Sequence, residues 1–329
     1  MYGRPLARTC HVTWAWLLAL AVGLWVPPPA ARSDDAPAPQ LCVLYPDVLP
    51  PYREVFQGIL EGIKSSDPLH PLCHHAIRER DDPPDLKKLF EEQPPKVVVT
   101  LGRVATQAFE RSGSTILQLI GALDISPATR PNASGISLAV DPERLFGRLL
   151  SLAPTVKRIL VVYDPARDQW IMDRARKAAA LLGIELHAEP ASTLIESAPK
   201  YGDYVRTARS GTDAIWLSST SGLVNDPDLI AYLIEQAWAR RIIVFSNTLD
   251  HAKAGVLFAP FPDPVALGRR LGTMALQTVE NPSQAPRIEA LTDFKIAVNV
   301  RIARHLGIFG GHEDLSRFDL VLDPTGGIE

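Results

Sequence analysis

The chain has few cysteines, no surplus of charge of either sign, and little that would cross a membrane. Only 3 of its 329 residues are cysteine, and 34 basic residues nearly balance 37 acidic ones. A dedicated nucleic-acid-binding protein normally carries a basic surplus, so this balance argues against that class. The composition, with 46% hydrophobic and 22% charged residues, is that of a globular protein. It disfavours intrinsic disorder and a polytopic membrane protein.

The N-terminal segment has the pattern of a secretory signal peptide. Two arginines precede an apolar stretch of about 13 residues, which is shorter than a membrane-spanning helix, and three prolines follow it. Ala31 and Ser33 supply the small residues before a cleavage site. We therefore expect 1–33 to be a signal peptide, 34–40 to be a Pro/Ala-rich tether, and the protein to be periplasmic. An uncleaved N-terminal anchor is the alternative.

Export changes what the cysteines can do. Loss of Cys10 with the signal peptide leaves the pair Cys42 and Cys73 in a compartment that permits disulfides. Each lies in a short apolar segment that is typical of a strand. If these are neighbouring strands of one parallel sheet, a disulfide is possible; the alternative is two buried free thiols.

Short apolar runs alternate with amphipathic segments along the whole body of the chain. The expected strands are 41–45, 72–77, 97–101, 116–120, 158–163, 184–187, 214–217, 242–245, 256–258 and 294–298. The expected helices are 54–64, 86–92, 104–111, one opened by Asp141, 169–182, one reaching about 208, 228–240, one from 263 to about 279, and 301–306. Continuous Val/Ile/Leu strands alternating with helices predict an α/β fold with parallel sheets covered on both faces. The pattern restarts after 131–135, which predicts two similar βα halves.

No established catalytic or cofactor motif is present. The sequence lacks a phosphate loop, a His-Glu-x-x-His helix, paired Cys-x-x-Cys motifs and a Gly-x-Ser-x-Gly elbow. His74 and His75 are consecutive in an expected strand, so their side chains point to opposite faces and do not easily share a metal. No histidine is placed by local sequence to activate the serines at 218–221. We expect a protein that is not an enzyme and has no cofactor or metal; an exported α/β hydrolase remains the less favoured alternative.

Polar residues and glycines follow the expected strands, in two groups of three. In open α/β sheets, ligands bind beyond the carboxyl ends of the strands. Hydroxyls and amides there can reach a small polar ligand, glycine lets backbone N–H groups approach it, and aromatic rings can cover its apolar part. Such residues are also ordinary turn formers. The candidate ligand-binding residues are Tyr45, Gly102, Arg103, Thr106, Gly121, Leu123, Tyr163, Asp164, Trp170, Ser219, Thr220, Asn247 and Thr248.

A series of short motifs carries a family resemblance. They are Val97–Gly102 with Ala105–Ala108, Ala133–Ser137 before the Asp141 helix, Val156–Pro165, Asp213–Leu217, and Phe294–Asn299 with Ala303 and Leu306–Ile308. In this order they resemble the type I periplasmic substrate-binding proteins of ABC transporters. The closest likeness is to the subfamily associated with aromatic amino acids and related small solutes. The resemblance covers most of the mature chain, as weak motifs in series.

The resemblance implies two Rossmann-like lobes joined by three hinge crossovers, near 135–138, 258–261 and 291–294. Lobe 1 would comprise 41–135 plus 259–292, and lobe 2 would comprise 136–258 plus 293–329. It implies a monomer that captures a small polar or amino-acid-like ligand, or a carboxylate, by lobe closure and delivers it to an ABC permease. A sensory or accessory subunit of the same fold, signalling to a membrane partner, is the alternative.

Two departures from the family pattern concern the ligand. Arg103 stands where relatives usually carry a small or polar residue, and the loop after Ile120 is short. Arg103 could pair a ligand carboxylate or fill the cleft. Asp164 could accept an ammonium group or cap the following helix, and Trp170 could stack on a ligand or pack on the surface. These alternatives stay open at the level of sequence.

Overall fold

The computed structural model describes residues 40–78, 86–92, 94–218, 226–310 and 314–322. The expected signal peptide and nearly all of the expected tether lie outside the described residues. Among the residues that the structure describes, no helix combines the length and the apolarity needed to cross a membrane.

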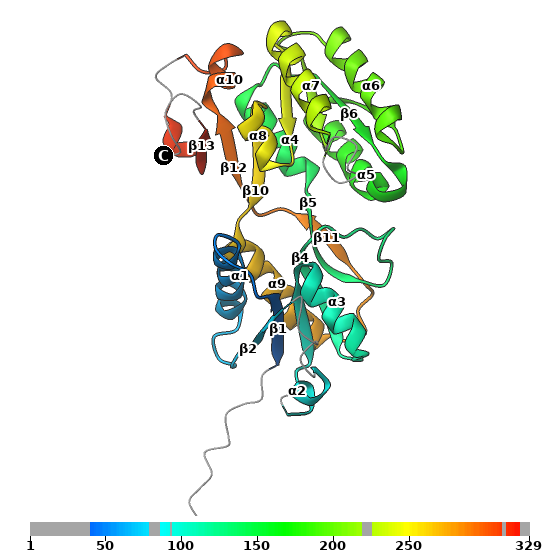
Figure 1. Ribbon diagram of the computed structural model, residues 1–329, viewed down its shortest axis with the longest axis vertical. Coiled ribbons are helices and arrows are strands. Elements are labelled where there is room, and N and C mark those ends of the chain that lie inside the picture. Colours follow the sequence, from blue (N-terminus) through cyan, green and yellow to red (C-terminus); the bar gives the residue numbers. More distant parts are fainter. Residues whose placement is uncertain (1–39, 79–85, 93, 219–225, 311–313, 323–329) are drawn as a thin grey trace, which may run out of the picture. The chain divides into compact units, whose positions relative to one another are not determined.

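Five strands from the first half of the chain, together with β11 from near its end, build a six-stranded sheet with the order β11-β5-β4-β3-β1-β2 (Figure 1). All of its paired strands are parallel. Its strands are β1 (Leu41–Pro46), β2 (Cys73–Ile77), β3 (Val97–Leu101), β4 (Leu117–Leu123), β5 (Ser134–Val140) and β11 (Ile288–Leu291). Every residue of β3 is buried, as expected for a central strand with helices on both faces. The sequence did not predict β5 and β11 as strands, and the sheet keeps β5 as far as Val140, beyond the expected lobe boundary at residue 135.

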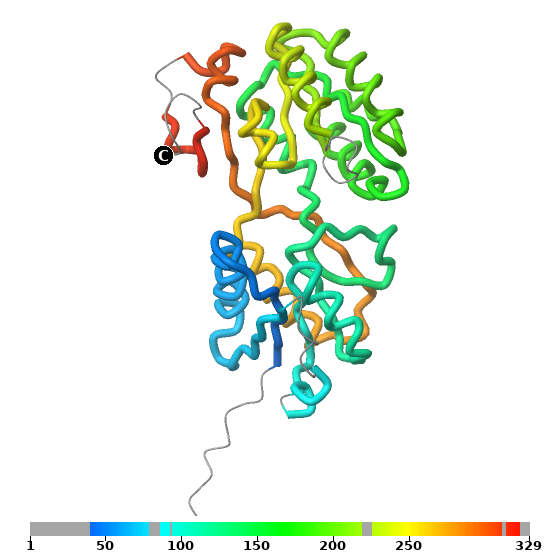
Figure 2. Tube along the Cα trace, viewed as in Figure 1, coloured from blue at the N-terminus to red at the C-terminus, as the bar shows by residue number. Residues whose placement is uncertain are grey.

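The helices of this half are α1 (Tyr52–Ser66), α2 (Leu86–Glu92), α3 (Gly102–Ser112) and α9 (Pro264–Glu280). The first three follow strands of the sheet directly. The fourth, α9, begins about 200 residues after the end of α1, and yet it packs along α1 and contacts β3, β4 and β5. Figure 2 shows this gold segment beside the blue start of the chain.

The remaining strands form two smaller sheets. A parallel four-stranded sheet has the order β7-β6-β8-β9, and a three-stranded sheet has the order β10-β12-β13. Their strands are β6 (Arg158–Tyr163), β7 (Glu185–Pro190), β8 (Asp213–Leu217), β9 (Ile243–Ser246), β10 (Phe258–Pro262), β12 (Phe294–Asn299) and β13 (Leu320–Leu322). The expectation that 256–258 continues the parallel sheet holds only at Leu257, whose N–H donates to Val244 O at 2.8 Å. Beyond it, β10 pairs antiparallel with β12.

The helices of this part are α4 (Pro142–Leu152), α5 (Pro165–Leu182), α6 (Leu194–Thr207), α7 (Pro227–Arg240), α8 (Leu249–Ala254) and α10 (Val300–His305), followed by the 3-10 turn η1 (Leu315–Arg317). Asp-Pro pairs open three of them, and the aspartate carboxylates at 141, 164 and 226 accept backbone N–H groups of the first turn. Helix α5 therefore starts at Pro165, four residues before the predicted start. The architecture is α/β with two parallel sheets, as predicted from the sequence, and a third, smaller sheet.

Glycines allow α1 and α9 to approach each other to backbone contact. A Cβ placed on Gly62 would lie 2.1 Å from Val265 O, and one placed on Gly268 would lie 2.1 Å from Ile59 O. Real side-chain carbons are not found at such distances, so neither position accepts even alanine without moving a helix. The close packing joins a segment from late in the chain to the first helix.

A disulfide links the first two strands. Cys42 on β1 and Cys73 on β2 are register partners in the parallel ladder, and their sulfurs are bonded across a sequence separation of 31 residues. Both residues are buried. The bond therefore closes the loop that contains α1, the helix on which α9 packs.

We expect Gly62→Ala to destabilise the protein by about 1–3 kcal/mol or more, because the added methyl overlaps the α9 backbone. The matched control is Gly147→Ala in α4, where nothing lies within 4 Å of the added carbon. This change should stabilise by about 0.5–1 kcal/mol, since alanine is the better helix former. Urea unfolding of both variants measures the difference. Equal effects of the two substitutions would contradict the close helix packing.

Removing the disulfide should cost about 3–4 kcal/mol, the loop-closure entropy expected for 31 residues. The measurement is thermal unfolding with and without dithiothreitol, on the unchanged protein and on the double variant Cys42→Ala/Cys73→Ala. Reductant should lower the melting temperature of the first and leave that of the second unchanged. Two free thiols in the non-reduced, oxidatively prepared protein would overturn the assignment.

Candidate functional site

The carboxyl ends of neighbouring parallel strands bring most of the predicted residues to two sheet edges. In the first sheet, β1, β3 and β4 are adjacent, and the segments after them start at Asp47, Gly102 and Asp124. In the four-stranded sheet, β6, β8 and β9 are adjacent, and the segments after them start at Asp164, Ser218 and Asn247. These edges are where open α/β sheets bind ligands.

The backbone at the first edge has an unusual shape. Gly102 has φ +73° at the start of α3, a conformation that favours glycine. Next to it, β4 has a register shift between Ile120 and Leu123, with Ala122 at φ +52°. A Cβ on Gly102 would lie 3.8 Å from the ring of Phe56 and 3.9 Å from Ala122 O. The ends of β3 and β4 and the side of α1 therefore meet at Gly102.

The bulge in β4 presents the carboxylate of Asp124. The hydroxyl of Ser137 on β5 donates to Asp124 Oδ1 at 3.1 Å, while Ser137 Oγ itself accepts the N–H groups of Ile125 and Ala139. Asp124 is accessible to solvent, but the protein around its carboxylate desolvates it and raises its pKa. The Ser137 hydrogen bond and the positive charge of Arg167 on α5 lower the pKa by less. The Asp124 carboxylate is therefore fixed by a hydrogen bond and partly desolvated.

Arg103 supplies a positive charge at the neighbouring strand end. It is the second residue of α3 and is exposed. Among the described residues, no carboxylate forms an ion pair with it. Because Leu101 and Gly121 are register partners on β3 and β4, Arg103 and Asp124 follow adjacent strand ends. Tyr45 and Leu123, both half-buried, belong to the same edge.

Three of the predicted residues are engaged inside the protein instead. The hydroxyl of Thr106 is fully buried and donates to Gly102 O at 2.7 Å. Gly121 is buried against Leu271, whose methyl would lie 2.5 Å from an added Cβ. The Tyr163 side chain is buried, and its hydroxyl accepts from Arg176 at 3.1 Å. Their structural contacts support the edge and leave little for a ligand to bind.

At the second edge, Asp164 caps a helix and the side-chain amide of Asn247 is held by a hydrogen bond. Asp164 caps α5 by accepting Ala166 N–H at 2.9 Å, which is the capping alternative seen in the sequence. Asn247 Oδ1 accepts the indole N–H of the buried Trp216 at 2.9 Å. Thr248 is half-buried and precedes α8 without a side-chain capping bond. Trp170 is half-buried against the core, with Arg174 over its ring at 6.0 Å. Ser219 and Thr220 lie outside the described residues.

The candidate residues predicted from the sequence include Gly121 and Leu123 but not Asp124. The signal was present, since Asp124 ends the segment 121–124 that follows the expected strand 116–120. What the sequence does not show is the bulge at Ala122, which turns the chain here, and the contact with Ser137 from the next strand.

One group of potential metal ligands occurs among the described residues. The sulfurs of Cys42 and Cys73 and a ring nitrogen of His75 lie within 4.8 Å of one another. Because the two sulfurs are bonded to each other, neither is available as a thiolate ligand.

Comparison with known proteins gives structural matches only. No family model matches the sequence, and no curated protein matches it. The fold is similar to the ligand-free, open structure of a substrate-binding protein with adhesive properties from Clostridium difficile. That match has 17% identity and a TM-score of 0.58, and covers 83% of this chain and 96% of that chain. The fold is also similar to an ABC domain in complex with L-Trp from Streptococcus pneumonia. That match has 16% identity and a TM-score of 0.51, and covers 87% of this chain and 100% of that chain.

We expect Asp124→Asn to raise stability at pH 7 and to have no stabilising effect below pH 3.8. The folded-state pKa of Asp124 lies above its usual 3.8, so the folded protein binds this proton more tightly than the unfolded chain. Ionisation therefore disfavours the fold as the pH rises through the folded pKa, and asparagine removes that effect. Melting temperatures measured from pH 3 to 8 test this. A destabilised variant at pH 7 would show a favourable role for the charge instead.

Proposed function

We propose that this chain is an exported solute-binding protein that captures a small amino-acid-like ligand between two lobes and delivers it to an ABC permease. The fold supports this, since similar folds are found in a substrate-binding protein and in an ABC domain that holds L-Trp. The ligand would occupy the two sheet edges described above. The protein would act as a monomer in the periplasm.

The observation that carries the ligand class is the pair Arg103 and Asp124. A guanidinium and a carboxylate follow adjacent strand ends, and no described residue forms an ion pair with either of them. An amino acid carries the complementary charges, a carboxylate for Arg103 and an ammonium for Asp124. A ligand with both charges satisfies both groups, whereas a ligand with one charge leaves the other group unpaired on closure.

The second edge would contribute when the lobes close. Asn247 is held by Trp216, and its amide N–H₂ is left to donate to a ligand carbonyl or carboxylate. Thr248 offers a hydroxyl, and Tyr45 and Trp170 offer aromatic surface. Ligand that contacts both edges only in the closed state shifts the open–closed equilibrium.

The lobes would be 41–135 plus 259–292 and 136–258 plus 293–329, as the sequence suggests. Three segments then cross between them: β5, β10 and the short link between β11 and β12. Strand β10 hydrogen-bonds to β12 along its length, so these two crossings are adjacent. Paired crossings of this kind restrict the motion to a hinge.

We propose binding without catalysis. Ser246 Oγ lies 2.7 Å from His251 Nδ1, which is hydrogen-bonding distance for a nucleophile and its base. The serine is fully buried, however, and its oxygen also accepts Thr248 N–H and donates to Leu217 O. These contacts give the pair a structural role at the end of β9.

The test measures binding of L-tryptophan, L-phenylalanine and L-leucine by calorimetry and thermal shift, with tryptamine and indole-3-propionate as single-charge analogues. At least one amino acid should stabilise the protein, and either analogue should bind at least about tenfold more weakly. Arg103→Ala should remove the discrimination against tryptamine, which lacks the carboxylate. Asp124→Asn should remove the discrimination against indole-3-propionate, which lacks the ammonium.

Matched controls are Arg111→Ala on the same helix as Arg103 and Asp203→Asn on α6, both exposed. Neither should change affinity. Binding that is insensitive to Arg103 and Asp124 would exclude this site. A protein that binds no amino acid in the series would exclude the ligand class.

A further inference from the structure

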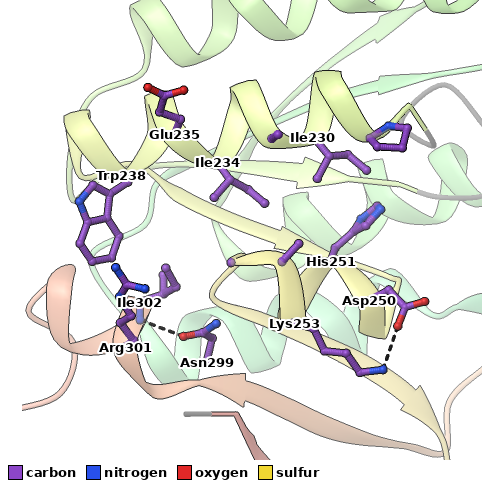
Figure 3. Close-up of a pocket in the computed structure, with 14 residues that line it drawn as sticks. Ile230, Ile234, Glu235, Trp238, Asp250, His251, Lys253, Asn299, Arg301 and Ile302 are labelled. Atoms are coloured by element: carbon purple, nitrogen blue, oxygen red, sulfur yellow. Dashed lines mark hydrogen bonds and ion pairs between the residues drawn. The ribbon is translucent and has the colours of Figure 1, made fainter. Parts of the chain in front are cut away.

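A separate apolar pocket lies between α7, α8 and α10. Its volume is about 650 Å³, within the range of small-molecule sites. Figure 3 shows that Ile230 and Ile234 from α7 face residues of α8 across the opening, while Arg301 and Ile302 from α10 lie at the far end. This pocket uses none of the ligand-binding residues named above.

The short length of α8 leaves the pocket open. It runs only from Leu249 to Ala254, and the chain then turns at Gly255 with φ +131°. A Cβ at Gly255 would lie 3.0 Å from Ile234 Cγ2, so the turn fits closely beneath α7. Among the residues that the structure describes, no further helical turn fills the space between α7 and α10.

His251 provides a polar group inside the pocket. Its side chain comes from α8 and points toward α7 (Figure 3). The residue is only 6% exposed and lines the pocket. Nδ1 lies 2.7 Å from Ser246 Oγ, which fixes the ring. Nε2 has no hydrogen-bond partner among the described residues. It is also not among the fully buried side-chain nitrogen and oxygen atoms that lack a partner. It is therefore left for an occupant of the pocket.

Arg301 provides a positive charge at the other end. Its guanidinium carbon lies 5.0 Å from the centroid of the Trp238 ring, and His305 stacks on the same ring at 3.6 Å. No carboxylate among the described residues pairs with Arg301. The other cation of the pocket, Lys253, is bound to Asp250 at 2.9 Å, and Glu235 points away from Arg301 in Figure 3. Arg301 is thus the available anchor for an anion.

We propose that this pocket is a second binding site, for a small apolar carboxylate. The carboxylate binds Arg301 at the Trp238 end, the hydrocarbon or aromatic body lies on Ile230, Ile234 and Ile302, and a polar group at its far end reaches His251 Nε2. Desolvation lowers the pKa of His251, so its ring is neutral at neutral pH and suits an uncharged partner. The proposal does not depend on the solute site at the strand ends.

The experiment measures binding of octanoate and 4-phenylbutanoate to the purified protein by calorimetry, with 1-octanol as the uncharged control. At least one carboxylate should bind with a Kd below about 1 mM, and more tightly than 1-octanol. Arg301→Ala should weaken carboxylate binding about tenfold or more and leave 1-octanol binding unchanged. Ile234→Trp should abolish binding of both by filling the pocket.

Each variant has a matched control in the same part of the chain. Arg206→Ala removes another exposed arginine, and Ile195→Trp adds the same bulk at a position that is 86% exposed. Both should bind octanoate as the unchanged protein does. Arg103→Ala removes the cation of the strand-end site and should leave octanoate binding to this pocket unchanged, which separates the two sites.

Three results would overturn the proposal. They are no carboxylate binding below about 1 mM, equal binding by Arg301→Ala and Arg206→Ala, or retained binding in Ile234→Trp. Loss of octanoate binding in Arg103→Ala would assign the carboxylate to the strand-end site instead. Melting temperatures of all variants identify any that fail to fold, and for such a variant Ile302→Trp replaces Ile234→Trp and Arg301→Gln replaces Arg301→Ala.

Discussion

The approach of α9 to α1 is the contact on which the rest of the arrangement depends. Without Cβ atoms at Gly62 and Gly268, the two helix backbones touch, and a segment from late in the chain becomes part of the first sheet's helical layer. The following strand, β11, then completes that sheet beside β5. To do this, the chain must leave the part of the protein that holds the two smaller sheets, and it returns to that part through β12. The discontinuous organisation thus goes together with this helix–helix contact, and the Cys42–Cys73 bond closes the loop that contains α1.

At the strand ends, backbone shape decides which side chains are available. The bulge at Ala122 presents Asp124, and Ser137 from β5 holds its carboxylate. Gly102 has no side chain, so it leaves room beside Phe56 and the carbonyl of Ala122. The charged groups of this edge are therefore placed by irregularities in otherwise regular strands.

The two proposed sites differ in chemistry and share one structural element. The strand-end site offers paired charges and amides, whereas the α7 pocket offers apolar surface with a cation at one end. Ser246 connects them, because its hydroxyl oxygen accepts Thr248 N–H at the strand end and contacts His251 in the pocket. Thr248, just before α8, thus belongs to one site, and His251, on α8, belongs to the other.

The sequence by itself determined the α/β class, nearly every helix, and the strands with continuous apolar runs, because burial on both faces leaves a direct pattern of Val, Ile and Leu. Asp-Pro caps marked helix starts for an equally local reason. Tertiary structure alone decided that β5 and β11 are strands, since they pair with each other across about 150 residues of sequence and their own composition is mixed. It also decided that Thr106, Gly121 and Tyr163 face inward, because a residue near a strand end can point either way. The α7 pocket was not visible in the sequence at all, since it arises where three separate elements fail to fill the space between them.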